Sequence, residues 1–152
     1  MRWFRVRAKR ASTVTKHYKE FKEEARVVIH SRLEYYNSFY GFAYNRVSVR
    51  NQRRCWGSCT SLKNLNFSYK LLFLPEHLRD YIIVHELCHL GELNHSKRFW
   101  ALVSRQIPDY KIRRKQMRQL ERNGTSIRSL TSLKEPSVTG RTIDGIAYTQ
   151  TV

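Results

Sequence analysis

Three histidines and one glutamate are spaced so that they could act together on a metal ion. His85, Glu86 and His89 form a His-Glu-x-x-His sequence, and His95 follows six residues after His89. Because residues four apart lie on one face of a helix, His85 and His89 can bind a single ion. Three protein ligands leave the fourth position of zinc open for water, whereas four ligands make a structural site. Glu86 would lie beside that open position as a general base, so the pattern predicts zinc-dependent hydrolysis.

The alternative is a helix with surface histidines and an ordinary glutamate. The segments 81–84 and 87–88 that flank the motif are apolar almost all round, which predicts a buried helix. Buried imidazoles and a buried carboxyl group need partners, and a metal ion with its water supplies them. We therefore favour a zinc site with His85, His89 and His95 as ligands and Glu86 as the catalytic residue.

Two further residues are candidates for supporting roles. The segment 90–94 lets the helix end at Gly91 and the chain turn back. Glu92 lies in this segment and could orient a ligand histidine as an outer partner. It could equally be a solvent-exposed acid of the loop, which we favour. Tyr110 is our candidate for the donor that shares the oxyanion charge, and the alternative is a core aromatic that anchors the last helix.

Composition limits the class of protein. The 152 residues are enough for one domain, and the net charge of +17 favours anionic partners, nucleic acid first, although a solvated surface is the alternative. No stretch approaches the roughly 20 apolar residues that span a bilayer, and no apolar segment follows the basic start, so we expect a cytoplasmic protein without membrane contact. The odd number of cysteines argues against a disulfide framework and predicts free thiols.

The elements that must position the site follow from periodicity and turn signals. Apolar residues at helical spacing predict a long helix over 16–40, ended by a left-handed Gly41. Alternation predicts strands over 44–50 and 65–69, with a turn or strand end at 53–59 between them. We expect the active-site helix over about 75–90, then a helix capped by Asn94 or Ser96, and a last helix from about 109 to 122.

The fold class expected is α+β, with a short mixed or antiparallel sheet. We divide the chain into a basic arm (1–15), one domain (16–124) and a flexible Ser/Thr-rich tail (125–152). The strand 65–69 is expected to form a rim above the active-site helix, where a peptide could add by backbone pairing. Trp56 is expected to fill the core rather than to serve as a platform for substrate.

Several short segments in chain order resemble one protein family. They are 56–59 (Trp-Gly-Ser-Cys), 74–75 (Leu-Pro), 80–90 around the motif, 94–100 (Asn-His-Ser-Lys-Arg-Phe-Trp) and 108–110 (Pro-Asp-Tyr). Over residues 18–120 the chain resembles the YgjP-like metallopeptidases, which are relatives of the SprT-like zinc proteases. The resemblance implies a small zincin-like α+β domain that binds one zinc ion through His85, His89 and His95, with Glu86 catalytic.

Three functions compete. The leading hypothesis is a zinc-dependent metallopeptidase with a polypeptide substrate, in a sharper version recruited by its basic surface to DNA-associated proteins, as the SprT-like relatives suggest. A non-catalytic, basic nucleic-acid-binding protein with a structural zinc ion is the contrasting class. The intact Glu86 argues against it, because a structural site needs no base. A zinc hydrolase of non-peptide amides is the third, and the sequence does not exclude it.

Overall fold

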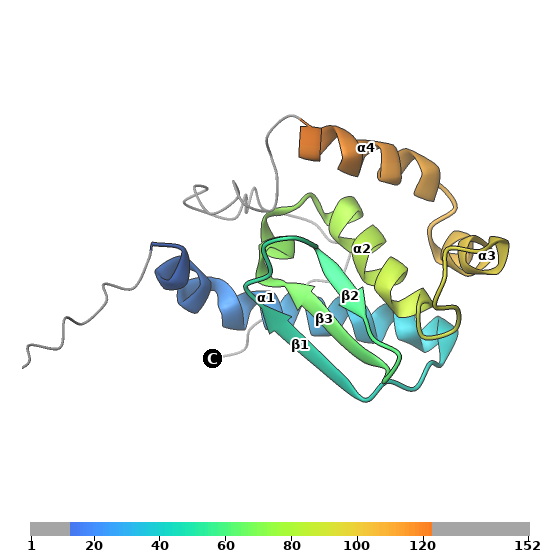
Figure 1. Cartoon of the computed structure of the whole chain (residues 1–152), viewed down its shortest axis with the longest axis horizontal. Coiled ribbons are helices and arrows are strands. Elements are labelled where there is room, and N and C mark those ends of the chain that lie inside the picture. Colours follow the sequence, from blue (N-terminus) through green and yellow to red (C-terminus); the bar gives the residue numbers. More distant parts are fainter. Residues whose placement is uncertain (1–12, 123–152) are drawn as a thin grey trace, which may run out of the picture.

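Three strands and four α-helices make up the described part of the chain, residues 13–122 of a computed structural model (Figure 1). The elements are α1 (Thr13–Tyr40), β1 (Arg46–Arg50), β2 (Gly57–Cys59), β3 (Asn64–Ser68), the 3₁₀ helix η1 (Tyr69–Phe73), α2 (Glu76–Cys88), α3 (Lys97–Gln106) and α4 (Tyr110–Arg122). The expected α+β class is confirmed. Helix α1 begins inside the segment expected to be an arm, and the remaining arm and tail lie outside the described residues.

The strands form one mixed sheet in the order β1-β3-β2. β1 runs parallel to β3, with Val47 opposite Leu65, and β2 runs antiparallel to β3, with Gly57 opposite Phe67. β3 is therefore the central strand, and both of its edges are already paired. The expectation that this strand forms an open rim for a peptide is wrong, because the strand next to the active-site helix is β2.

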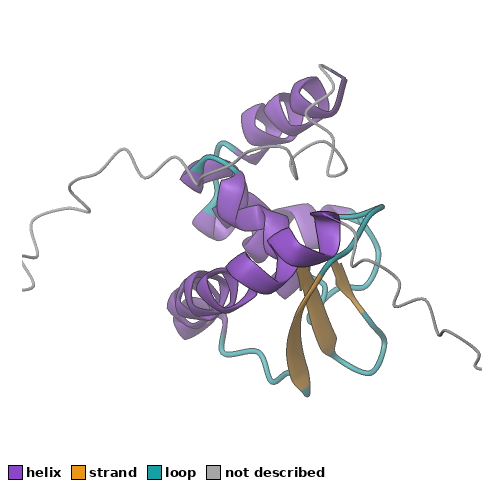
Figure 2. Cartoon of the chain, turned by 90° about the vertical axis from the view of Figure 1, so that its left-hand side faces the viewer, coloured by secondary structure: helices purple, strands orange, loops and turns teal. Residues whose placement is uncertain are grey.

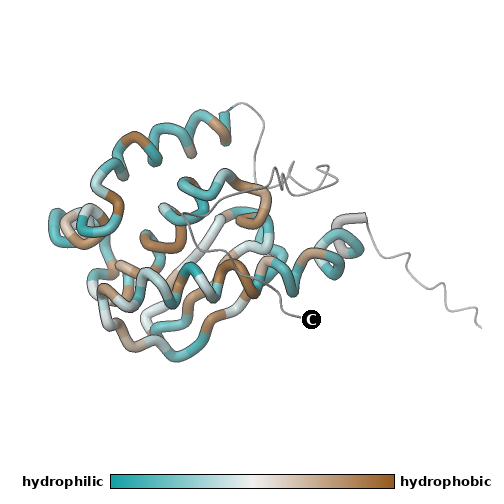
Figure 3. Tube along the Cα trace, turned by 180° about the vertical axis from the view of Figure 1, so that it is seen from behind, coloured by the Kyte–Doolittle hydropathy of each residue, from teal (hydrophilic) through white to brown (hydrophobic). Residues whose placement is uncertain are grey.

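Helix α1 crosses one face of the sheet, and the helices gather on that side (Figures 1 and 2). Its buried side chains recur every three or four residues at Ala25, Ile29, Leu33 and Tyr36, so they share one face of the helix. Figure 3 shows hydrophobic and hydrophilic stretches alternating along this helix. The helix ends as predicted at Gly41, whose φ of 66° suits glycine and whose N–H donates to the carbonyl of Asn37 at 2.7 Å.

Helix α2 lies at the centre of the molecule, between α1, β2 and α4 (Figure 1). Its middle is buried on nearly every side, as the sequence predicted, and includes Tyr81, Ile83, Val84 and Leu87. Helix α4 lies along α2 and is hydrophilic over most of its length (Figure 3), with Met117 as its buried residue. Within residues 13–122, no helix is long and apolar enough to cross a membrane.

Candidate metal centre

Three imidazoles meet at the carboxyl end of α2. His85 lies in the last turn of the helix, His89 directly follows it, and His95 returns from the loop before α3. The ring centroids are 4.8 to 4.9 Å apart in all three pairs. One nitrogen from each ring lies within 4.8 Å of the other two, and the Nε2 atoms of His85 and His95 are 3.0 Å apart. The structure thus brings together the three ligands that the sequence predicted.

The turn after α2 returns the chain to the helix end through backbone hydrogen bonds. His89 keeps helical dihedral angles as the residue that caps the helix, so its four-residue relation to His85 is preserved. Gly91 has no left-handed conformation, but a Cβ atom there would lie 2.9 Å from Cζ of Phe42. The glycine is therefore needed for close packing, which the sequence did not reveal.

His95 is placed by the start of α3. The hydroxyl of Ser96 accepts a hydrogen bond from the N–H of Phe99 at 3.2 Å, so Ser96 is the cap of this helix. Asn94, the other residue considered for this role, accepts from the N–H of Ser96 at 3.1 Å. Since these bonds fix both neighbours of His95, the capping sequence is what holds the third imidazole beside the first two.

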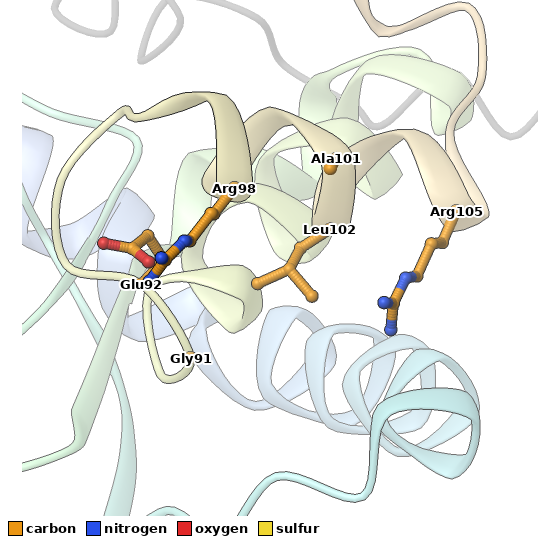
Figure 4. A pocket seen from close by; sticks show the side chains of 6 residues that line it. All are labelled: Gly91, Glu92, Arg98, Ala101, Leu102 and Arg105. Carbon is orange, nitrogen blue, oxygen red and sulfur yellow. The ribbon is translucent and has the colours of Figure 1, made fainter.

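Glu92 contacts the site through its backbone rather than its carboxylate. Its carbonyl oxygen is 3.0 Å from Nδ1 of His89, so the ring donates there and turns Nε2 toward the other two histidines. The Glu92 side chain is half-buried and lines a pocket behind α3 with Gly91, Arg98, Ala101, Leu102 and Arg105 (Figure 4). Both roles predicted for Glu92 concerned its side chain. The contact made by its backbone carbonyl is one that a pattern of side chains does not reveal.

Aromatic rings from α3 pack around the imidazoles. The Phe99 ring lies 4.4 to 4.9 Å from all three histidine rings, and Trp100 lies 5.7 Å from His95 and 5.9 Å from His85. Tyr110 stacks on Trp100 at 4.9 Å, with an interplanar angle of 14°. Phe99 and Trp100, expected only as an apolar helix face, are the wall of the site, and Tyr110 stacks on that wall.

Burial sets the protonation of the site. It lowers the pKa of His85 to about 3, helped by the nearby rings of His89 and His95, so this imidazole is neutral and can donate a lone pair to a metal. Burial also raises the pKa of the Glu86 carboxyl group to about 8. This carboxyl group has no hydrogen-bonding or charged partner within residues 13–122 that opposes the effect.

The three histidines fit a divalent cation. Converging imidazoles can satisfy only part of their hydrogen-bonding capacity with one another, and the buried Nδ1 of His85 has no partner in the described chain. Two nitrogens bound tetrahedrally to one zinc ion at about 2.0–2.1 Å lie roughly 3.3 Å apart, close to the observed 3.0 Å. Nitrogen ligands suit zinc and several other transition metals.

A family model described as YgjP-like, metallopeptidase domain, matches residues 4–120. The chain belongs to the YgjP-like metallopeptidase family. Among solved structures, this YgjP-like chain is similar to the metallopeptidase zymogen of Pyrococcus abyssi abylysin, with a TM-score of 0.54 and 23% identity. That alignment covers 60% of this chain and 92% of the other, and it shows the shared fold. A search of curated proteins found no match.

The other sequence candidates have structural positions. Trp56 is buried in the core, as expected, and its indole N–H donates to Glu121 of α4 at 3.0 Å. The thiols of Cys55, Cys59 and Cys88 are free, as predicted. Within residues 13–122, one group of three or more His, Cys, Asp or Glu side chains lies close enough together to bind a metal ion. It consists of His85, His89 and His95.

Proposed function

We propose that this YgjP-like chain is a zinc-dependent endopeptidase in which Glu86 is the general base. The observation that carries the proposal is the convergence of three imidazoles, with that of His85 kept neutral by burial, at the end of the helix that also carries the buried, unpaired carboxyl group of Glu86. When bound there, zinc supplies Lewis-acid activation of water and of the substrate carbonyl. A purely structural metal would have no use for the adjacent carboxyl group, which argues against a non-catalytic role.

Each residue of the site has a defined task. Nitrogen atoms of His85, His89 and His95 bind the metal, and the Glu92 carbonyl orients the His89 ring. A carboxylate oxygen of Glu86 accepts the proton of the attacking water and returns it to the leaving amine nitrogen. Burial raises the pKa of this carboxyl group above its usual range, which favours a group that must take up and release a proton in each cycle.

Tyr110 is our proposed donor to the developing oxyanion. Its ring stacks on Trp100, and the Trp100 ring lies next to His85 and His95. Tyr110 is half-buried, and its hydroxyl group has no hydrogen bond within residues 13–122 that would compete with a substrate. A Tyr110→Phe variant keeps the stacked ring and removes the donor. We expect it to lower kcat while leaving metal content unchanged.

The substrate backbone is proposed to pair with β2. This strand uses one edge to pair with β3, and no strand within residues 13–122 pairs with its other edge. Backbone pairing places a peptide next to α2 and depends little on side chains, so we expect broad sequence tolerance. This proposal replaces the predicted rim at β3.

We further propose that the enzyme acts on DNA-associated proteins in the cytoplasm. Support comes from α4, where Lys111, Arg114, Lys115, Arg118 and Arg122 are exposed. The ion pairs within residues 13–122 involve none of these five and are Arg26–Glu23, Arg32–Glu76, Arg32–Asp80 and Arg113–Asp109. Uncompensated cations on one helix attract phosphate groups.

The test is metal content and casein cleavage for the wild type and Glu86→Gln, each with and without DNA. Stoichiometric zinc with cleavage lost only in the variant supports a peptidase, and stimulation by DNA supports recruitment. Zinc without cleavage under any condition contradicts the peptidase proposal and favours a hydrolase of non-peptide amides or a structural metal. Equal cleavage by Glu86→Gln excludes Glu86 as the base.

A further inference from the structure

The side chain of Glu86 lies against the backbone of β2 at Gly57. A Cβ atom built on Gly57 would lie 2.6 Å from Cγ of Glu86 and 3.0 Å from its Cδ and Oε1 atoms. Non-bonded carbon atoms pack at about 3.5–4.0 Å, so even a methyl group would overlap with Glu86. Gly57 has no positive φ, since Gly41 is the glycine with that conformation within residues 13–122. Space for Glu86, rather than backbone conformation, is what requires a glycine at position 57.

The backbone at Gly57 is held from the sheet side. Gly57 pairs with Phe67 of the central strand, and the N–H of Ser68 donates to the carbonyl of Trp56 at 2.8 Å. Phe67 and Ser68 have no exposed surface. These bonds hold β2 against movement away from Glu86, so we expect a clash at Gly57 to be relieved mainly by movement of the Glu86 side chain.

The start of β2 is also held from the helix side. The Trp56 side chain is 7% exposed, and its indole N–H donates to Oε1 of Glu121 at 3.0 Å. Glu121 lies in the last turn of α4, 65 residues along the chain from Trp56. Glu121 takes part in none of the four ion pairs of the described chain, so its carboxylate is free to serve this contact.

We propose that Gly57 is a positioning residue for Glu86, and that Glu121 fixes Gly57 by holding Trp56. The inference rests on the proposed function, in which Glu86 is the general base. A carboxylate without hydrogen-bonding partners is oriented by the surfaces it touches, and β2 supplies one of them. Displacing a reacting group by about 1 Å costs on the order of 100-fold in rate, so this surface matters for turnover.

The contact itself is tested by unfolding, independently of activity. Gly57→Ala is compared in two backgrounds of the full, zinc-saturated chain, wild type and Glu86→Ala, by thermal unfolding. We expect a lower unfolding midpoint in the wild-type background and most of that loss to disappear with Glu86→Ala, because Cγ, Cδ and Oε1 are then absent. Equal losses in the two backgrounds overturn the inference.

Gly41→Ala is the matched control for these measurements. Gly41 has a φ of 66° and no atom within 4 Å of an added Cβ, so alanine there strains the backbone without touching the site. Its unfolding midpoint is expected to fall by the same amount in both backgrounds, and its kcat per folded molecule is expected to equal that of the wild type. The comparison separates a general loss of stability from an effect on Glu86.

Kinetics test the consequence for catalysis. We expect Gly57→Ala to lower kcat by about tenfold or more, with KM and zinc content nearly unchanged. Glu121→Ala is expected to lower kcat by less than Gly57→Ala does. Glu121→Gln is expected to keep kcat near the wild-type value, because the amide oxygen still accepts a hydrogen bond from the indole N–H. Wild-type kcat in Gly57→Ala overturns the inference. A wild type that cleaves nothing counts against the proposed function, while the unfolding comparison still decides the contact.

Discussion

Two acidic residues of α2, Asp80 and Glu86, are buried to a similar extent but have opposite surroundings. Asp80 is 4% exposed and Glu86 is 7% exposed. Asp80 accepts hydrogen bonds from both Nε and Nη2 of Arg32 and from the hydroxyl of Tyr36, all on α1. Glu86 has no such partner in the described chain and lies against Gly57 instead.

The difference shows how one helix serves both the fold and the site. The guanidinium of Arg32 compensates the charge of Asp80, so that carboxylate joins α2 to α1. Burial without compensation raises the pKa of Glu86 to about 8, which costs stability but produces a group able to exchange protons near neutral pH. Unpaired burial, rather than burial alone, distinguishes Glu86 from Asp80.

The largest expected effect is that of Glu86→Gln on turnover. The amide cannot accept the proton of water, and general bases contribute about 10²- to 10⁴-fold, so kcat is expected to fall by that factor. The unfolding midpoint should stay the same or rise, because a buried ionisable group is replaced by a neutral one. Peptide-cleavage kinetics and thermal unfolding measure the two effects. A marked loss of stability would show that Glu86 has a structural partner and would remove the contrast with Asp80.

His95→Ala should act on the metal. With one of three ligands missing, zinc affinity is expected to fall by more than the roughly 10- to 100-fold typical of losing an outer partner. Competition with a chromophoric chelator measures the affinity. His30→Ala, on α1, is the control and should bind zinc like the wild type. Unchanged affinity in His95→Ala would remove His95 from the ligand set.

Asp80→Asn should lower stability and leave turnover unchanged, whereas Glu86→Gln should lower turnover and leave stability unchanged or raised. The Asp80→Asn change removes the hydrogen-bonded counter-charge of the Arg32 guanidinium and leaves it the more distant Glu76 at 3.9 Å. Breaking a buried pair costs about 3–5 kcal/mol. Because the Arg32 side chain is 26% exposed, we expect about 1–3 kcal/mol of unfolding free energy to be lost, with kcat per folded molecule unchanged. Urea unfolding and active-site titration measure these quantities. A loss of kcat at full folding would mean that the Asp80 network also serves catalysis.

The smallest effect on catalysis is expected from charge reversal on α4. Replacing Lys111, Lys115 and Arg118 with glutamate should weaken DNA retention and reduce its salt dependence, since the logarithmic salt slope is about −0.9 per phosphate contact. Casein cleavage without DNA should change little. Reversal of Arg26 on α1, which already pairs with Glu23, is the control. Equal retention by the α4 variant would mean that this helix is ordinary solvated surface.

Local signals predicted the elements and the histidine cluster well. The helix over 16–40, the capped turn at Gly41 and the spacing of His85, His89 and His95 all follow from short-range pattern, and the structure agrees. Sheet order did not follow, because the placement of β2 rather than β3 at the open edge depends on pairing between distant strands. The carbonyl of Glu92 and the close approach of Gly57 to Glu86 are backbone features that residue type does not report.

The hydrogen bond between Trp56 and Glu121 bears on how short a working version of this enzyme can be. The family match ends at residue 120, and Glu121 is the next residue. A chain trimmed to the matched segment would keep His85, Glu86, His89 and His95, yet it would lose the carboxylate that holds the start of β2. Such a fragment should bind zinc normally and still turn over slowly, so the smallest efficient unit extends past the boundary that similarity alone suggests.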